Sequence, residues 1–239
     1  MEKILLTTLF LILTACSNND IITWENYDEK SEIIENSTHE ISRMRYKRIQ
    51  SLSSDKNKIF SPFYPFLKSY DLAYHESIKE FIVNKDISTI QAYISEDKFS
   101  YEDLVKFFIY RIYKHELDKN LYLNAIISLN PNVINEAREL DKKVQKDNLL
   151  YGIPILVKDN INVKDLTTTA GASVFINNYV DNNAFVINQL KKNDVLILGK
   201  LNMSEWAYYF CRPCPVGYSS LGGQTLNPYG RKIFESGGS

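Results

Sequence analysis

A short apolar run that ends on a lysine constrains the fold of this chain more than any other feature. Residues 153–157 read IPILV, and Lys158 follows directly. An apolar run of this length beside glycine and proline is typical of a strand buried on both faces. Burying an ammonium is costly unless it is paired or loses its proton. Two interpretations are open here: Lys158 turns into solvent or pairs with Asp159, or its amine serves a reaction.

A second apolar run at residues 195–198 is followed closely by Lys200, and apolar residues at helical spacing lie between the runs, at 184–192. Strand, helix and strand in this order form a right-handed βαβ unit with parallel strands. Functional loops follow the carboxyl ends of such strands, so Lys158 and Lys200 are both expected at that edge. The small residues TTTAGAS, 167–173, suit a close approach of two backbones.

Amphipathic helices are expected ahead of this unit, from about residue 75. Ser100 begins SYED, a helix cap with an acidic residue three positions on, and apolar residues follow at helical spacing as far as Ile112. Another helix follows the pair Asn130-Pro131. Nothing on these helices looks catalytic. The predicted fold class is α/β, with N-terminal helices followed by part of a mostly parallel or mixed sheet with flanking helices.

Composition excludes several classes of function. The formal charge of −1 and the absence of zinc-finger or RNA-binding signatures argue against a nucleic-acid partner. Only three histidines are present, none near a cysteine pair or in an HExxH pattern, so no protein-held metal is expected. Cys211 and Cys214 have the spacing of a metal or redox pair, but no second pair completes a zinc site. A small disulfide in an oxidising compartment is the other interpretation.

The first sixteen residues have the pattern of a bacterial lipoprotein signal. Lys3 is followed by a mainly apolar run at 4–13, too short for a good transmembrane span, and then by LTAC. This sequence resembles the lipobox, which implies cleavage before Cys16 and stable anchoring by several acyl chains on it. Ser17 weakly resembles an outer-membrane sorting signal, so the expected location is the bacterial cell envelope, at the outer membrane or periplasmic face in a Gram-negative species. The alternative is an uncleaved signal or a chance apolar terminus.

The expected organisation is a signal peptide at 1–15, a tether at 16–75 and a domain at 76–239. Polar and charged residues dominate the tether and its apolar residues keep no clear period, so little core is expected there. Its basic cluster RMRYKR, 43–48, suits anionic lipid head groups or, alternatively, a solvated helix face, and no function is assigned to it. SPFYPF, 61–66, is expected to be an extended segment on the domain edge.

Five motifs follow one another in a fixed order: GIPILVKDN, TTAGA, ILGKLNMSEWA, GGQTLNPYG and SGGS. Together they resemble the amidase signature family of serine amide hydrolases, and the resemblance covers residues 76–239. Leu201 stands where the family usually has threonine, at a position with no catalytic role. The resemblance implies hydrolysis of carbon–nitrogen bonds in small-molecule amides, without a cofactor, by an incomplete amidase signature fold.

The family's catalytic apparatus is a lysine, a serine with a cis peptide bond and a nucleophilic serine. The resemblance assigns the lysine to Lys158 and the bridging serine to Ser239, with Gly237 and Gly238 in the active-site loop. The nucleophile needs a nearby base, and a lysine desolvated among apolar strands can be that base at neutral pH. The cis bond costs about 3 kcal/mol, which the surrounding fold must supply. Glu205 is interpreted as a local cap or partner, not as a base.

In the family, the nucleophilic serine and the oxyanion donors lie downstream of the position that Ser239 matches. We therefore expect the membrane-anchored N-terminal half of an amide hydrolase, completed in cis or by a separate C-terminal half, and inactive alone. The alternatives are a catalytically inactive truncated remnant and a non-enzymatic envelope binding module. The amidase subunit of the tRNA-dependent amidotransferase shares these motifs, but the lipobox argues against a cytosolic protein.

Overall fold

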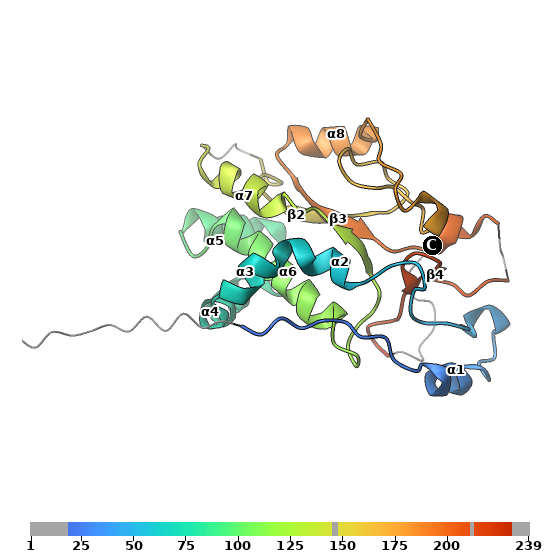
Figure 1. Cartoon of the computed structure of the whole chain (residues 1–239). Coiled ribbons are helices and arrows are strands. Elements are labelled where there is room, and N and C mark those ends of the chain that lie inside the picture. Colours follow the sequence, from blue (N-terminus) through green and yellow to red (C-terminus); the bar gives the residue numbers. More distant parts are fainter. Residues whose placement is uncertain (1–18, 145–147, 211–212, 231–239) are drawn as a thin grey trace, which may run out of the picture.

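The computed structural model describes residues 19–144, 148–210 and 213–230, which form short helices around a small sheet (Figure 1). The helices are α1 (Lys30–Asn36), α2 (Asn57–Phe60), α3 (Tyr64–Ser69), α4 (Leu72–Ile82), α5 (Ile87–Ser95), α6 (Tyr101–Glu116), α7 (Val133–Asp141) and α8 (Phe185–Lys192). The 3-10 turns are η1 (Ser42–Met44), η2 (Ser61–Phe63), η3 (Ser173–Phe175) and η4 (Glu205–Tyr208). The strands are β1 (Ile126–Leu129), β2 (Pro154–Lys158), β3 (Leu196–Leu201), β4 (Tyr218–Ser219) and β5 (Gly223–Gln224). None of the helices in this part of the chain has the length and apolar character that a bilayer span requires.

The main sheet has three strands in the order β1-β3-β2. Strands β2 and β3 run parallel and are joined through α8, whereas β1 pairs with β3 in the antiparallel direction. The βαβ unit and the mixed α/β class predicted from the sequence are confirmed. Strands β4 and β5 form a separate two-stranded sheet.

Two apolar clusters cover opposite faces of the main sheet. Val157 and Ile197 pack with Ile187 of α8, while Leu196 and Leu198 belong to the larger cluster that contains the buried face of α6. In Figure 1 the sheet accordingly lies between α8 and α6. Because both faces are covered, the first five positions of β3 are buried and its sequence shows no alternation of polar and apolar residues.

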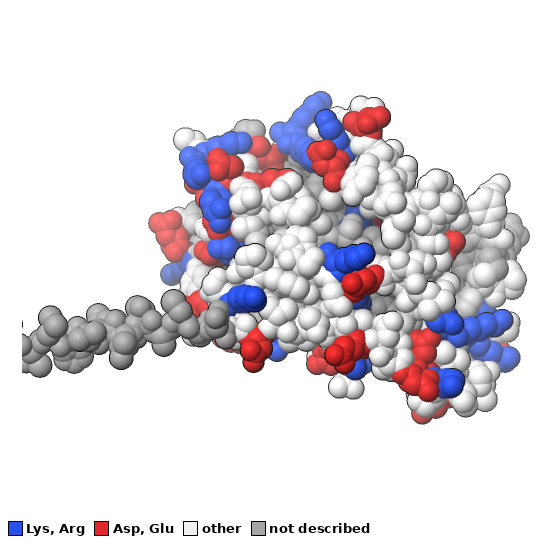
Figure 2. Space-filling model, viewed as in Figure 1, with Lys and Arg blue, Asp and Glu red and all other residues white. Residues whose placement is uncertain are grey.

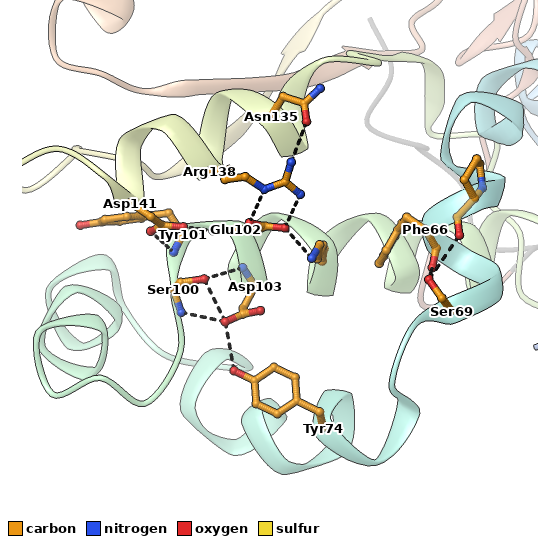
Figure 3. A network of polar contacts seen from close by, with 12 residues as sticks. Phe66, Ser69, Tyr74, Ser100, Tyr101, Glu102, Asp103, Asn135, Arg138 and Asp141 are labelled. Atoms are coloured by element: carbon orange, nitrogen blue, oxygen red, sulfur yellow. Dashed lines mark hydrogen bonds and ion pairs between the residues drawn. The ribbon is translucent and has the colours of Figure 1, made fainter. Parts of the chain in front are cut away.

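A polar network joins the start of α6 to α7 (Figure 3). The Ser100 hydroxyl accepts from the Asp103 amide at 3.1 Å, and the Asp103 carboxylate accepts from the Ser100 amide at 3.0 Å, which confirms the predicted cap. Asp141, the last residue of α7, accepts from the first two amides of α6, each at 2.9 Å. Arg138 donates twice to Glu102, at 2.9 and 2.7 Å. These contacts hold the start of α6 against α7.

Residues 19–75 contribute to the core, and the prediction of little core in this stretch is wrong. The segment runs along the lower side of the molecule to α1 and returns through α2 and α3 (Figure 1). Its buried side chains in the main cluster are Trp24, Tyr46, Ile49, Phe60, Phe63 and Leu67. Lys56 is half-buried, with its ammonium 2.9 Å from Glu116 of α6 and 4.5 Å from the centre of the Trp24 ring. These residues come from irregular backbone and from the short elements α2, η2 and α3, none longer than two helical turns, so the sequence shows no sustained period.

Two local expectations in the same stretch are also wrong. SPFYPF forms η2 and the start of α3 instead of an extended segment. The basic cluster at 43–48 is no helix face beyond the turn η1, because Met44 and Tyr46 are buried between exposed basic residues. Figure 2 shows charges of both signs over α7, α8 and α1, and neither sign covers the described surface of this view continuously.

Candidate active site

Loops from three parts of the chain meet at the carboxyl ends of β2 and β3. The strand register places Lys158 opposite Leu201, at the last position of each strand. The loop after β2 folds back, and the Ala170 amide donates to the Asp159 carbonyl at 3.1 Å. Two later segments bind this loop, since the Trp206 amide donates to the Ala170 carbonyl at 2.9 Å and the Leu221 amide to the Gly171 carbonyl at 3.0 Å. The predicted close approach of backbones at TTTAGAS is thus present.

Lys158 is half-buried, and among the described residues its ammonium has no ion-pair or hydrogen-bond partner. The register places its side chain on the same face of β2 as Leu156, which packs against the α6 cluster. Pro154 and Leu156 also line an apolar cavity of about 580 Å³ beside α6. The interpretation that Lys158 pairs with Asp159 is wrong, because that carboxylate pairs with another lysine.

Lys200 is the lysine that pairs with Asp159. Both side chains are fully buried, and the Lys200 Nζ lies 3.3 Å from the Asp159 Oδ1. The ammonium also donates to the Ile161 carbonyl at 2.8 Å, the Thr168 hydroxyl at 3.1 Å and the Thr167 carbonyl at 3.3 Å. Burial lowers the pKa of Lys200, and the neighbouring Asp159 opposes that shift. The three N–H groups of the Lys200 ammonium therefore have four oxygen acceptors around them, and protein encloses the ammonium on all sides.

An irregularity in β3 decides which way Lys200 points. Ile155 lies opposite Ile197, but the next residue of β2, Leu156, lies opposite Gly199, so Leu198 is an extra residue on β3. A bulge of this kind re-aims the side chains that follow it. Here it places Lys200 opposite Val157, on the α8 face, where Asp159 also points because side chains alternate along a strand. Without the bulge Lys200 would continue the row of Leu196 and Leu198 toward α6.

Asn202 organises a second polar centre directly after β3. Its Oδ1 accepts from the Ser219 hydroxyl at 2.7 Å and its Nδ2 donates to the Asn124 carbonyl at 2.9 Å. Gly222 must be glycine, because a Cβ there would lie 2.3 Å from the Asn202 Oδ1. Glu205 accepts from the Ser220 amide at 2.7 Å, so its partner lies in another segment of the chain and not in its own turn. These contacts fix the segment 219–224 beside the first loop.

Three consecutive residues above this centre have left-handed backbone. The φ angles of Trp206, Ala207 and Tyr208 are 54°, 50° and 72°. Such conformations cost of order 1–3 kcal/mol each outside glycine and persist only when the surroundings enforce them. The Trp206 ring lies 5.1 Å from Phe175 and 5.5 Å from Phe210, between centroids. Strained backbone of this kind concentrates at functional sites, and sequence patterns do not reveal it.

Several residues predicted for the site lie outside the described part of the chain. They are Cys16, Gly237, Gly238 and Ser239, and with them the predicted cis peptide bond. Cys211 is also outside it, whereas Cys214 is described and is disulfide-bonded. Within the described ranges no three His, Cys, Asp or Glu side chains are grouped to hold a metal ion.

Comparison with known proteins connects this geometry to one family. The family model "Amidase" matches residues 103–239. A probable amidase of Arabidopsis thaliana is 35% identical over 159 residues, which are 64% of this chain and 30% of that protein. A putative amidase of Schizosaccharomyces pombe is 33% identical over 157 residues, which are 64% of this chain and 26% of that protein.

Solved structures show the same similarity. An amidase family protein from Bacillus anthracis superposes with a TM-score of 0.74 at 36% sequence identity, over 79% of this chain and 38% of that chain. This chain therefore spans 26–38% of the length of these similar proteins.

Proposed function

Because this chain belongs to the amidase family, we propose that it supplies the catalytic lysine of an enzyme that hydrolyses carbon–nitrogen bonds in small-molecule amides. One observation carries the proposal. Lys158 lies half-buried at the carboxyl end of a parallel strand, in the family's motif, and has no partner for its amine among the described residues. An amine in such a place can exchange a proton with a neighbouring hydroxyl, and proton transfer of this kind accelerates reactions by about 10²–10⁴-fold.

The proposed reaction proceeds through a serine. Lys158 accepts a proton through the bridging hydroxyl of Ser239, in the loop with Gly237 and Gly238, while the nucleophilic serine attacks the amide carbonyl. The proton then passes to the nitrogen that leaves as the amine, and water releases the acid. We propose that the nucleophile and the oxyanion donors come from the C-terminal part of the family fold, in the same polypeptide or as a separate chain. This chain spans 30% of the length of the Arabidopsis thaliana protein and 38% of the Bacillus anthracis protein, which supports that division.

We also propose that the protein is lipidated on Cys16 and anchored at the bacterial cell envelope. The signal pattern and the LTAC sequence support this. The Asn19 amide donates to the Lys68 carbonyl at 2.9 Å, so the described fold begins three residues after the proposed lipid. Three residues span at most roughly 10 Å, so a lipid on Cys16 would keep the domain near the bilayer surface. The same signal favours an envelope amidase over the amidotransferase that shares these motifs.

A pair of lysine variants tests the catalytic proposal in the protein as it is isolated from its own membranes. Lys158→Met removes the proposed base, and Lys164→Met removes an exposed lysine six residues further along the same loop. We expect the first variant to lose about 100-fold or more of the amide hydrolysis and the second to retain it. Hydrolysis that survives Lys158→Met contradicts the proposal.

The anchor has its own test. Metabolic labelling with a radioactive fatty acid is expected to mark the wild-type protein and not the Cys16→Ser variant. Equal labelling of both, or recovery of unlabelled wild-type protein in the soluble fraction, contradicts lipidation at Cys16.

A further inference from the structure

We propose that the buried Lys200–Asp159 ion pair is a positioning device for Lys158, acting through the peptide bond that joins Lys158 to Asp159 and through the loop that follows. The inference rests on the proposed function, because it assumes that the Lys158 amine is the reactive one. Burying two charges is costly, and a buried pair by itself is weak evidence for stability. Its best attested benefit is to select one arrangement of the chain around it. The contacts of this pair indicate which arrangement it selects.

Asp159 has no freedom to rotate. Its Oδ2 accepts from the Thr169 amide at 3.1 Å and from the Gly171 amide at 3.3 Å, and it also bonds the Thr169 hydroxyl. Its Oδ1 accepts no hydrogen bond from the other described residues, so the Lys200 ammonium at 3.3 Å is its compensating contact. The Asp159 backbone is fixed as well, since its amide donates to the Leu201 carbonyl at 3.2 Å. The chain immediately after Lys158 is therefore held from both the side chain and the backbone.

Lys200 ties the two ends of the same loop together. Its ammonium binds the carbonyl of Ile161 near the start of the loop and the Thr167 carbonyl and Thr168 hydroxyl near its end. The loop is thus closed around one cation, and it cannot shift without breaking several buried hydrogen bonds. Lys200 itself is fully enclosed and unable to meet a substrate, so it positions and does not catalyse.

The bulge at Leu198 separates the two lysines by function. It sends Lys200 to the α8 face, against Asp159, while Lys158 stays on the opposite face of the sheet. With its neighbouring carboxylate occupied, Lys158 is left without that partner. One acidic residue thereby fixes the strand end and leaves the adjacent amine available.

The test measures the Lys158 amine without requiring turnover. Trace labelling with acetic anhydride across a range of pH, followed by mass spectrometry of the peptide, gives the pH midpoint of Lys158 labelling in the full-length protein. The positioning variant is Lys200→Met/Asp159→Asn, which removes both charges together. The matched control is Lys56→Met/Glu116→Gln, which removes a second, largely buried ion pair of the same chain, with 12% and 7% of its side chains exposed, between α6 and the N-terminal segment.

We expect the positioning variant to move the labelling midpoint by about half a pH unit or more, and to lose hydrogen-exchange protection at the Thr169 and Gly171 amides. The control is expected to leave the midpoint and both amides unchanged. An unchanged midpoint in a folded positioning variant overturns the inference, because the pair is then only structural. Equal shifts in both variants also overturn it, because general loosening then explains them.

A milder variant covers the case in which the double variant does not fold. Thr169→Val removes the hydroxyl that bonds Asp159 and keeps the ion pair. We therefore expect the pH midpoint of Lys158 labelling to shift in the same direction as in the double variant, but by less. An unchanged midpoint in Thr169→Val would contradict the inference. Failure of the proposed function is separately visible. Amide hydrolysis that survives Lys158→Met, together with a Lys158 midpoint that still depends on the pair, refutes the catalytic proposal and leaves the positioning role standing.

Discussion

Two ion pairs of this protein use the same chemistry in opposite surroundings. Arg138 and Glu102 meet at the start of α6 with 46% and 17% of their side chains exposed, whereas Lys200 and Asp159 meet below the site with none exposed. Water screens the first pair, so its contribution is small and substitutions there are tolerated. The second pair has no water to replace a lost partner, so the surrounding loop depends on both members. The difference shows that burial, more than the type of contact, decides what an ion pair does.

The largest effect is expected when the buried pair is broken on one side. Lys200→Met leaves the Asp159 carboxylate buried without its cation, and we expect a loss of about 3–5 kcal/mol in the free energy of unfolding. Urea denaturation followed by circular dichroism measures it. A loss below about 1 kcal/mol is what an exposed ion pair is expected to contribute. The buried and the exposed pair would then not differ in their contribution to stability.

The next largest effect is expected at Ser100, the cap of α6, near the exposed Arg138–Glu102 pair. Ser100→Ala removes the hydroxyl that accepts from the Asp103 amide, so we expect a loss of roughly 1 kcal/mol in the same urea experiment. Ser100→Thr is the control, because the threonine hydroxyl can accept from the Asp103 amide and donate to the Asp103 carboxylate as the serine hydroxyl does. If both substitutions destabilise equally, the cap is not the source of the loss.

A smaller effect is expected at the exposed pair. Arg138→Ala should cost about 0.2–1 kcal/mol, and the difference from wild type should shrink at high salt. The Arg138 hydrogen bond is the largest cause of the lowered pKa of Glu102, so that pKa should rise in the variant, as NMR titration of the carboxyl would show. A cost that salt leaves unchanged would contradict the view that water screens this pair.

The smallest effect is expected on the pH dependence of the free energy of unfolding, through one histidine among the helices. His75 is buried against Phe107, with ring centroids 4.4 Å apart, and burial lowers its pKa. The unfolded chain then takes up a proton first, so stability is constant above pH of about 6.5 and falls as the pH drops below it. Comparing urea unfolding of wild type and His75→Gln at pH 7.5 and 5.5 isolates this group. Equal pH dependence in both proteins would exclude His75 as the cause.

Local rules predicted much of the helical layer and of the βαβ unit. The cap at Ser100 and the helix after Asn130-Pro131 follow from contacts a few residues apart, and both are present. The packing of residues 19–75 was missed, because Trp24 enters the core from irregular backbone and Phe60 from the four-residue helix α2, and neither leaves a period. Contacts between segments that are far apart in the chain have no local signal.

The amino-acid sequence by itself determined the two apolar strands, the lysines at or next to their carboxyl ends, the cap of α6 and the order of the motifs. Only the tertiary structure decided which lysine is buried. An unbroken apolar run contains no alternation, so it does not tell which face a side chain after it will take. The bulge at Leu198 exists because β3 pairs with β2, and it turns Lys200 toward Asp159 while Lys158 points to the other face. The register between strands therefore separates the two amines, and register is a property of the folded sheet.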